Sequence, residues 1–346
     1  MGISFFRCLK YGKNVPMKVI RYRIKDSTKE KELSKLSSNV NLVWNTCNDM
    51  IRKQWKESRK YTTKAQLNKI TRGASKELNI NQQTVQAISY ELLLRIQKVK
   101  KQVRFRSRKK SLPWIPFNGQ TMKLVGDVVF YNGMDFNLWI TRPLCGKIKT
   151  GSFTCDARGR WYINFSCEDK AEAFCGQGEI GLDLGMISTV TTSQAEKLKA
   201  SRYRKWEKKL AMAQRACKKK LARTIHAKIK NSRKDAIEKF TTKIAEVNSL
   251  VVIGKMESKK LIKTFLAKST YDNGWYMLKT RLSHKVVKHG GKYLEVPENF
   301  TSRTCSHCNL GWILPKGLKS LAIREYQCPG CLSLQDRDVN AARNIL

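Results

Sequence analysis

Two cysteine pairs near the end of the chain constrain its folding more than any other feature. Cys305-Ser-His-Cys308 and Cys328-Pro-Gly-Cys331 are separated by nineteen residues, which is the spacing of a zinc ribbon. Four thiolates complete a tetrahedral site with no open coordination position, so the pattern predicts a structural Zn²⁺ held by Cys305, Cys308, Cys328 and Cys331. His307 lies between two of these ligands and is interpreted as a spacer residue.

Two aspartates stand in motifs that favour chemistry. Asp183 ends an apolar run inside Gly181-Leu-Asp-Leu-Gly185, where the flanking glycines leave room for a ligand near the carboxylate. Asp338 soon follows the second cysteine pair and precedes Asn340-Ala-Ala, whose small residues suit a helix packed closely on a sheet. Taken alone, Asp183 is also compatible with a turn residue and Asp338 with a helix N-cap.

The charge of the chain points to a polyanionic partner. In 346 residues, 69 Lys and Arg face 27 Asp and Glu, which gives a net charge of +42. Such an excess repels itself unless a polyanion neutralises it, so we expect nucleic acid, with a ribosomal-type scaffold or an anionic membrane as alternatives. No apolar run approaches the ~18 residues of a membrane span, and no signal peptide is evident. We therefore predict a cytoplasmic protein, acting on the nucleoid of a prokaryote, with no membrane partner.

The high positive charge of the chain favours a functional interpretation of the two aspartates. A chain that binds phosphate has little reason to bury acids unless they hold Mg²⁺, which prefers oxygen ligands. Two ions ~3.5–4 Å apart stabilise both the attacking and the leaving oxygen of a phosphodiester. Three acids are the usual minimum, so a glutamate is expected beside Asp183 and Asp338.

Hydrophobic periodicity predicts an α+β chain of several domains. The first half combines strands with helices inserted after the first strand, and we expect these strands to close one β-barrel. Strands are predicted at 18–24, 122–131, 136–141, 151–155 and 161–167, and helices at 33–51, 65–78 and, after an Asn81 cap, 82–96. The second half alternates strands and helices as in an α/β sheet of the RNase H type. Its strands are predicted near 180–190, 250–253 and 293–296, and its helices at 197–243 and 271–287.

Four motifs together resemble the TnpB family, the insertion-sequence-encoded relatives and ancestors of type V CRISPR effectors. They are Gly181-Leu-Asp-Leu-Gly185, Asp272-Asn-Gly-Trp-Tyr-Met-Leu-Lys279, Thr301-Ser-Arg-Thr-Cys-Ser-His-Cys308 and Asp336-Arg-Asp-Val-Asn-Ala-Ala-Arg-Asn-Ile345. The resemblance is continuous from about residue 178 to 346, and over the first 170 residues only the architecture is similar. It implies Mg²⁺-dependent cleavage of double-stranded target DNA, directed by a guide RNA, by a RuvC domain. It places the first catalytic aspartate at Asp183 and the last at Asp338, with Asp336 the weaker candidate.

The resemblance also implies a division into domains. A wedge-like β-barrel is expected over 1–26 and 99–175, with a helical recognition domain inserted at 27–98. A RuvC-like nuclease domain is expected over 176–302 and 334–346. The zinc ribbon at 303–333 would interrupt it as a domain that binds the target nucleic acid.

The motif that lies between those of Asp183 and Asp338 departs from the family pattern. Most relatives carry a glutamate directly after the apolar strand, whereas Gly254 stands there in this chain. Glu257 is one substitute, an incomplete site is a second explanation, and a carboxylate from another strand is the third. We prefer the third and predict Glu325, because the resemblance extends to a subset with a rearranged site in which a glutamate before the second cysteine pair replaces the lost one. A salt bridge is the structural alternative for Glu325, and an exposed loop acid for Glu257.

Basic segments are expected to bind the nucleic acid. Residues 98–110 hold eight cations, with Phe105 among them, and residues 197–243 hold eighteen cations against three acids. Cations beside aromatic rings suit phosphate contacts and base stacking. The family implies a guide RNA that pairs with the target and a protein that recognises a short motif beside it. Alternatives are a nuclease-inactive guided repressor, a compact type V CRISPR effector and a DDE-type transposase; the oligomeric state does not follow from the sequence.

Overall fold

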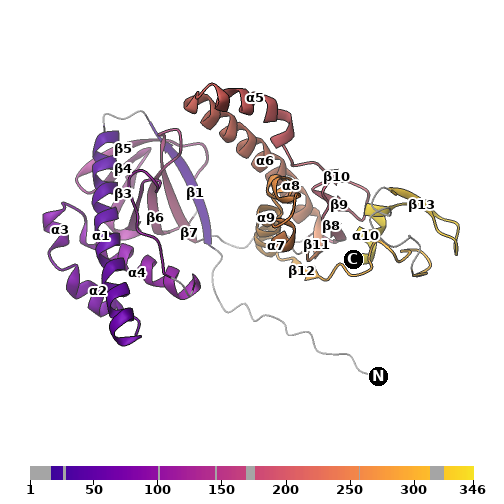
Figure 1. Cartoon of the computed structure of the whole chain (residues 1–346), viewed down its shortest axis with the longest axis horizontal. Helices are drawn as coiled ribbons and strands as arrows, with labels where there is room; N and C mark the ends of the chain where they lie inside the picture. The colour runs from indigo at the N-terminus through magenta and orange to yellow at the C-terminus, as the bar shows by residue number, and fades with distance from the viewer. Residues whose placement is uncertain are drawn as a thin grey trace. The chain divides into compact units, whose positions relative to one another are not determined.

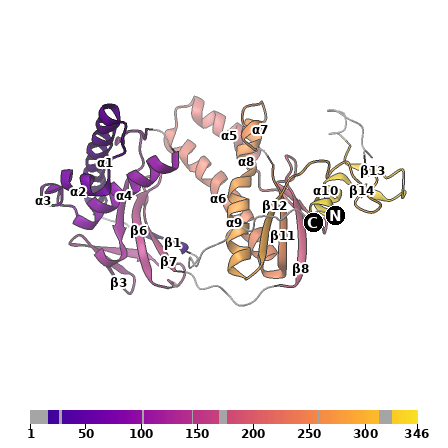
Figure 2. The same ribbon diagram turned by 90° about the horizontal axis from the view of Figure 1, so that it is seen from below.

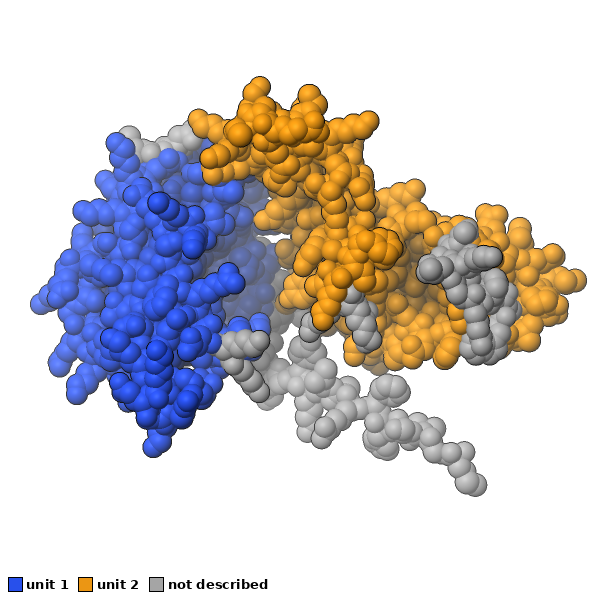
Figure 3. All heavy atoms as spheres, in the orientation of Figure 1, with its two compact units in different colours: residues 1–170 blue, residues 171–346 orange. Residues whose placement is uncertain are grey.

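The chain divides into two compact units, 1–170 and 171–346, which Figure 3 colours separately. The computed structural model describes residues 17–25, 29–99, 102–144, 146–168, 176–256, 258–311 and 323–346. Each unit has its own hydrophobic core, and both contain helices and strands, so the predicted α+β class is confirmed. Among the described residues, no helix is long and apolar enough to cross a membrane.

Unit 1 combines one antiparallel sheet with four helices inserted after its first strand (Figure 1). The strands, in the order β2-β6-β7-β1-β5-β4-β3 across the sheet, are β2 (Trp114–Asn118), β6 (Ile148–Cys155), β7 (Trp161–Glu168), β1 (Met17–Ile24), β5 (Met134–Trp139), β4 (Val128–Tyr131) and β3 (Met122–Val125). The helices are α1 (Glu30–Ser58), α2 (Lys64–Ile70), α3 (Ala74–Glu77) and α4 (Gln82–Val99). Asn81 accepts from the Gln83 amide, as expected of a residue that caps the start of α4.

The predicted barrel is observed as a near-closed sheet. The edge strands β2 and β3 do not pair with each other among the described residues. They are nevertheless consecutive in the chain and joined only by the short η1 helix (Gly119–Thr121), so the two edges must lie near each other. The predicted strand 122–131 is a hairpin, because the chain turns at Gly126 between β3 and β4.

Unit 2 is built on a five-stranded sheet in the order β10-β9-β8-β11-β12. Its strands are β8 (Gly178–Asp183), β9 (Val190–Thr192), β10 (Lys197–Leu198), β11 (Asn248–Gly254) and β12 (Lys292–Val296). β8, β11 and β12 are parallel, whereas β9 is antiparallel to both of its neighbours. The carboxyl ends of the three parallel strands therefore meet at one edge of the sheet.

Helices cover both faces of this sheet. α6 (Lys219–Val247) and α9 (Trp275–Lys288) lie on one face and α10 (Arg337–Ile345) on the other (Figures 1 and 2). α5 (Tyr203–Arg215) packs on α6, and the shorter α7 (Ser258–Leu261) and α8 (Ala267–Asn273) precede α9. The hairpin of β13 (Glu325–Gln327) and β14 (Leu334–Asp336) leads into α10.

Candidate functional site

The four cysteines of the predicted zinc site converge. Their sulfur atoms all lie within 4.8 Å of one another, with Cys305 3.7 Å from Cys331 and Cys308 3.6 Å from Cys328. Four sulfurs at this separation suit the tetrahedral coordination of Zn²⁺. The buried Gln335 donates from Nε2 to the Cys305 sulfur at 3.0 Å, as an outer-shell partner of a metal thiolate does. The chemistry and geometry of the residues therefore fit a structural zinc ion.

The two cysteine pairs form matching turns. The amides of Asn309 and Leu332 donate to the carbonyls of Cys305 and Cys328, the first cysteine of each pair. Asn309 and Leu332 both adopt positive φ, at 57° and 56°. Burial opposes ionisation of Cys305, but amides of the same turn, together with the neighbouring thiols, lower the pKa of its thiol to about 6. A thiol of low pKa is a ready metal ligand.

Asp183 ends β8 on the face of the sheet that α10 covers. Side chains alternate along a strand, and Ile180 and Leu182 lie in the core under α6 and α9. Gly181 and Asp183 therefore face the opposite side. Gly181 allows α10 to approach closely, because a Cβ there would stand 2.0 Å from the Ala342 carbonyl oxygen. The small residues predicted to pack a helix on the sheet do so.

Asp338 stands in the first turn of α10, on this same face. The N-cap of α10 is Asp336, which accepts from the amides of Asp338 and Val339 and pairs with Lys197 at 2.5 Å. The alternative interpretation of Asp338 as the N-cap is therefore wrong: the β13–β14 hairpin ends at Asp336, so that residue occupies the cap position. The Asp338 carboxylate pairs with Arg324 at 3.4 Å.

A third acid, which sequence reasoning missed, reaches the same edge of the sheet. Glu298 follows β12, and its side chain lies across Gly254 at the end of β11. A Cβ at Gly254 would stand 2.1 Å from Glu298 Oε1, so only glycine leaves room for it. Oε1 is buried and has no hydrogen-bond partner among the described residues. The sequence offers one indication of Glu298. It stands just beyond the third parallel strand, and so at the same edge of the sheet where Asp183 ends the first.

The charges of Glu298 and Asp338 act on Asp183. Burial, followed by the negative charges of Glu298 and Asp338, raises the pKa of Asp183 to about 8, and the Arg337 guanidinium opposes this shift. Burial also raises the pKa of Glu298. Hard oxygen donors, mutual repulsion and an unpartnered carboxylate oxygen all favour a bound cation, so the residues fit Mg²⁺. Unlike the sulfurs, they do not converge within 4.8 Å among the described residues.

The structure describes one of the two glutamates predicted from the sequence. Glu325 is exposed on β13, where it pairs in register with Asp336. It is not among the charges that act most strongly on Asp183. Glu257 lies outside the described residues. Glu298, which the sequence did not single out, is the glutamate whose charge acts most strongly on Asp183 among the described residues.

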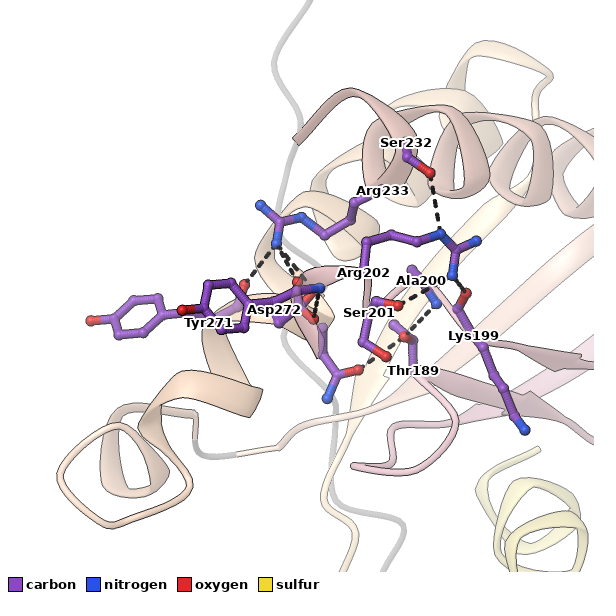
Figure 4. Close-up of polar contacts among 11 residues, drawn as sticks. Thr189, Lys199, Ala200, Ser201, Arg202, Ser232, Arg233, Tyr271 and Asp272 are labelled. Atoms are coloured by element: carbon purple, nitrogen blue, oxygen red, sulfur yellow. Dashed lines mark hydrogen bonds and ion pairs between the residues drawn. The ribbon is translucent and has the colours of Figure 1, made fainter. Parts of the chain in front are cut away.

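The Asp272-Asn-Gly motif forms a polar junction between α8 and the base of α5 (Figure 4). Asp272, only 6% exposed, pairs with Arg233 of α6 at 3.0 Å and accepts from the Tyr203 amide at 2.7 Å, so it satisfies the start of α5. Asn273 accepts from the Thr189 hydroxyl, beside β9. The junction fastens α5 and α6 to the sheet that carries Asp183.

Two family models match unit 2 and the strand before it. A model described as "Probable transposase" (OrfB_IS605) matches residues 164–264, and "Cas12f1-like, TNB domain" matches residues 275–345. The first includes Asp183 and Gly254, and the second includes the four cysteines and Asp338.

Curated relatives extend this similarity. A "Putative RNA-guided DNA endonuclease" of Streptomyces pristinaespiralis is 32% identical over 208 residues, which cover 55% of this chain and 50% of that protein. InsQ of Escherichia coli K12, described in the same words, is 27% identical over 239 residues, 60% of this chain and 58% of InsQ. The TnpB-like protein L79 of Acanthamoeba polyphaga mimivirus is 32% identical over 139 residues, 37% of this chain and 26% of L79. The chain thus aligns with between about a quarter and three fifths of the length of these relatives.

Solved structures give a weaker likeness. A Cas12f1–sgRNA–target DNA complex aligns with a TM-score of 0.37 and 14% identity, covering 95% of this chain and 98% of that one. A CRISPR–Cas12f ternary complex aligns with a TM-score of 0.40 and 13% identity, covering 91% of this chain and 80% of that one. Neither TM-score is high enough to support an argument. The family models and the curated relatives together support the TnpB family as the group of proteins that this chain resembles.

Proposed function

We propose that this chain is an RNA-guided DNA endonuclease whose RuvC-like site hydrolyses phosphodiesters with Mg²⁺. The single observation that carries the proposal is that Glu298 and Asp338 lie near enough to Asp183, at one edge of the unit 2 sheet, for their charges to act on it. In a chain of net charge +42, burial and then the charges of Glu298 and Asp338 raise the pKa of Asp183. The strand order supports an RNase H-type assignment. Two strands parallel to β8 lie on one of its sides, and β9 and β10, which are antiparallel to each other, lie on the other. The curated relatives bear the same activity in their names.

The three carboxylates would hold Mg²⁺, in two ions when the site is full. The metal would supply charge neutralisation for the phosphate and activation of the attacking water. Asp183 is positioned by β8, Glu298 by its place over Gly254, and Asp338 by the close packing of α10 on Gly181. Because each acid comes from a different segment, the fold itself sets their separation. Pre-organised groups of this kind need little rearrangement during the reaction.

The cationic helices are proposed to bind the guide RNA and its target strand. Between the start of α5 and the middle of α6 lies a cavity of about 620 Å³, and the described residues that line it are cations, one tryptophan and small polar residues. The lining residues are Ser201, Arg202, Lys205, Trp206, Lys228, Asn231 and Ser232. Such a surface suits phosphates and a stacked base. Unit 1 is proposed to recognise the short motif beside the target, as base pairing recognises the rest.

A cleavage assay tests the proposal. The protein would be purified with its co-expressed RNA and given a matched duplex target, with and without Mg²⁺. We expect cutting by the wild type, none by Asp183→Asn or Glu298→Gln, and near-normal cutting by Glu325→Gln. Loss of cutting only in Glu325→Gln would restore the assignment made from the sequence. Target binding without cutting by the wild type would instead establish a guided repressor.

A further inference from the structure

Unit 1 contains a cavity on α1 that the nuclease chemistry does not use. The cavity has a volume of about 260 Å³ and is lined by one face of α1 together with residues from α4 and from the chain after it. Asn48, Ile51, Arg52 and Trp55 line it from α1. These positions follow the i, i+3, i+4, i+7 spacing of a single helix face, so their side chains project to the same side.

Flat and apolar groups form the walls. Trp55 and Tyr61 have ring centroids 4.6 Å apart with planes inclined by 34°. The turn that ends α1 at Arg59, which has positive φ, directs the chain back so that Tyr61 meets Trp55. Ile51 and Ile96, both nearly fully buried, complete the apolar lining. This enclosure suits a planar ring system held by stacking.

Two buried polar atoms in the lining have no hydrogen-bond partner within the part of the chain that the structure describes. Asn48 is 1% exposed, and while its Nδ2 donates to the Val103 carbonyl at 3.0 Å, its Oδ1 accepts nothing. Arg52 also donates from Nη2 to Val103 and stacks 4.3 Å from the Phe105 ring centroid, but its Nε donates to nothing. Buried polar atoms without partners are rare in folded proteins. One free acceptor and one free donor four residues apart on a helix match a ligand that carries both groups along one edge.

We propose that this cavity binds a single nucleobase turned out of a nucleic acid strand. The edge of the base would donate to Asn48 Oδ1 and accept from Arg52 Nε, while its face would pack against Trp55 and Tyr61. An unstacked base is commonly held by contacts of these two kinds. The segment 98–110, which contributes Gln102 and Val103 to the wall, holds eight cations in its sequence, and these suit the adjoining phosphates. The proposal concerns binding by unit 1 and does not depend on the nuclease site.

Fluorescence binding experiments on the full chain test the proposal. The probes are RNA and DNA octamers that contain 2-aminopurine, whose emission falls when it stacks, and an octamer of abasic sugar-phosphate as a backbone control. We expect Trp55→Leu and Arg52→Ala to weaken binding of the base-bearing octamers by roughly 5- to 100-fold, the range found for loss of one stacked base. The abasic octamer should bind these variants nearly as well as it binds the wild type. RNA and DNA arms show which strand supplies the base.

Lys53→Ala is the matched control for charge. Lys53 is the neighbour of Arg52, is 63% exposed and does not line the cavity. Its replacement by alanine therefore removes the same charge without changing the proposed site. Equal weakening of base-bearing and abasic octamers by Arg52→Ala would overturn the proposal. A photocrosslink from a 5-iodouracil octamer to wild-type protein gives a readout that needs no variant. Crosslinks to the peptide that carries Trp55 and Tyr61 would support the pocket, and crosslinks confined to other aromatics would refute it.

Discussion

Replacing Gly254 with alanine tests how Glu298 is placed beside Asp183. The added Cβ would stand 2.1 Å from Glu298 Oε1 and 2.5 Å from its Cγ, whereas ordinary contact begins at 3.4 Å. The Glu298 carboxylate must therefore retreat by more than about 1 Å, and a misplacement of that size can lower a reaction rate by roughly 10²-fold. The backbone of Gly254 has no positive φ, so Ala is accepted by the strand itself. We expect Gly254→Ala to fold normally and to cut its target roughly 10²-fold more slowly.

Single-turnover cleavage with the co-expressed RNA measures the effect, and stabilisation by Mg²⁺ in a thermal melt gives a second readout. Gly311→Ala is the control, because a Cβ at Gly311 meets nothing within 4 Å. If Glu298 is the only group displaced, Gly254→Ala should add nothing to the loss caused by Glu298→Ala, so the double variant should match the single one. Gly254→Glu combined with Glu298→Ala should recover part of the activity. Additive losses, or wild-type cutting by Gly254→Ala, would refute the steric argument.

Three further predictions concern the metals and the junction under α5. Because the pKa of Asp183 is raised to about 8, the folded chain without metal binds a proton that the unfolded chain releases, so its stability should fall as the pH rises from about 4 to 8. Mg²⁺ must displace that proton, so its apparent affinity should rise by about tenfold per pH unit from 6 to 8 and level off above; a titration flat in pH would contradict this. Elemental analysis should find one zinc per chain in the wild type and much less in Cys328→Ser, whose buried ligand is lost; equal zinc in both would exclude Cys328 as a ligand. Asp272→Ala leaves the half-buried Arg233 unpaired and the start of α5 uncapped, so chemical denaturation should show a loss of about 3 kcal/mol. Asp235→Ala breaks only an exposed pair and should cost less than about 1 kcal/mol.

The sequence was sufficient for features that depend on local spacing. The two cysteine pairs are each four residues long, and each folds into the same turn whatever surrounds it, so their convergence could be predicted. The positions of Asp183 at a strand end and of Asp338 in a helix packed on that strand could be predicted, because short motifs specify them. The small residues Gly181 and Ala342 allow α10 to pack closely on β8, so their presence in the sequence indicates that contact.

Features that depend on distant segments could not be predicted in the same way. The predicted helix 271–287 is two helices, because Gly274 adopts a φ of +69° between α8 and α9 and turns the chain at the Asp272 junction. Glu298 stands in a loop with no recognisable motif, and only the parallel register of β8, β11 and β12 brings it over Gly254. Glu325 was chosen because it precedes a cysteine pair, yet that strand belongs to a separate two-stranded sheet.

The exchange between Gly254 and Glu298 bears on how such chains are compared. An alignment compares the residues that occupy each position, and by that comparison Gly254 is a position where an expected acid is missing. In the fold, Gly254 and Glu298 depend on each other. Because Gly254 at the end of β11 has no side chain, the side chain of Glu298, which follows β12, can lie over it. A glycine in that column is then evidence of where to look for the acid. On the proposed function, surveys that discard chains for lacking a glutamate at this position would also discard chains that supply it from the loop after the neighbouring strand.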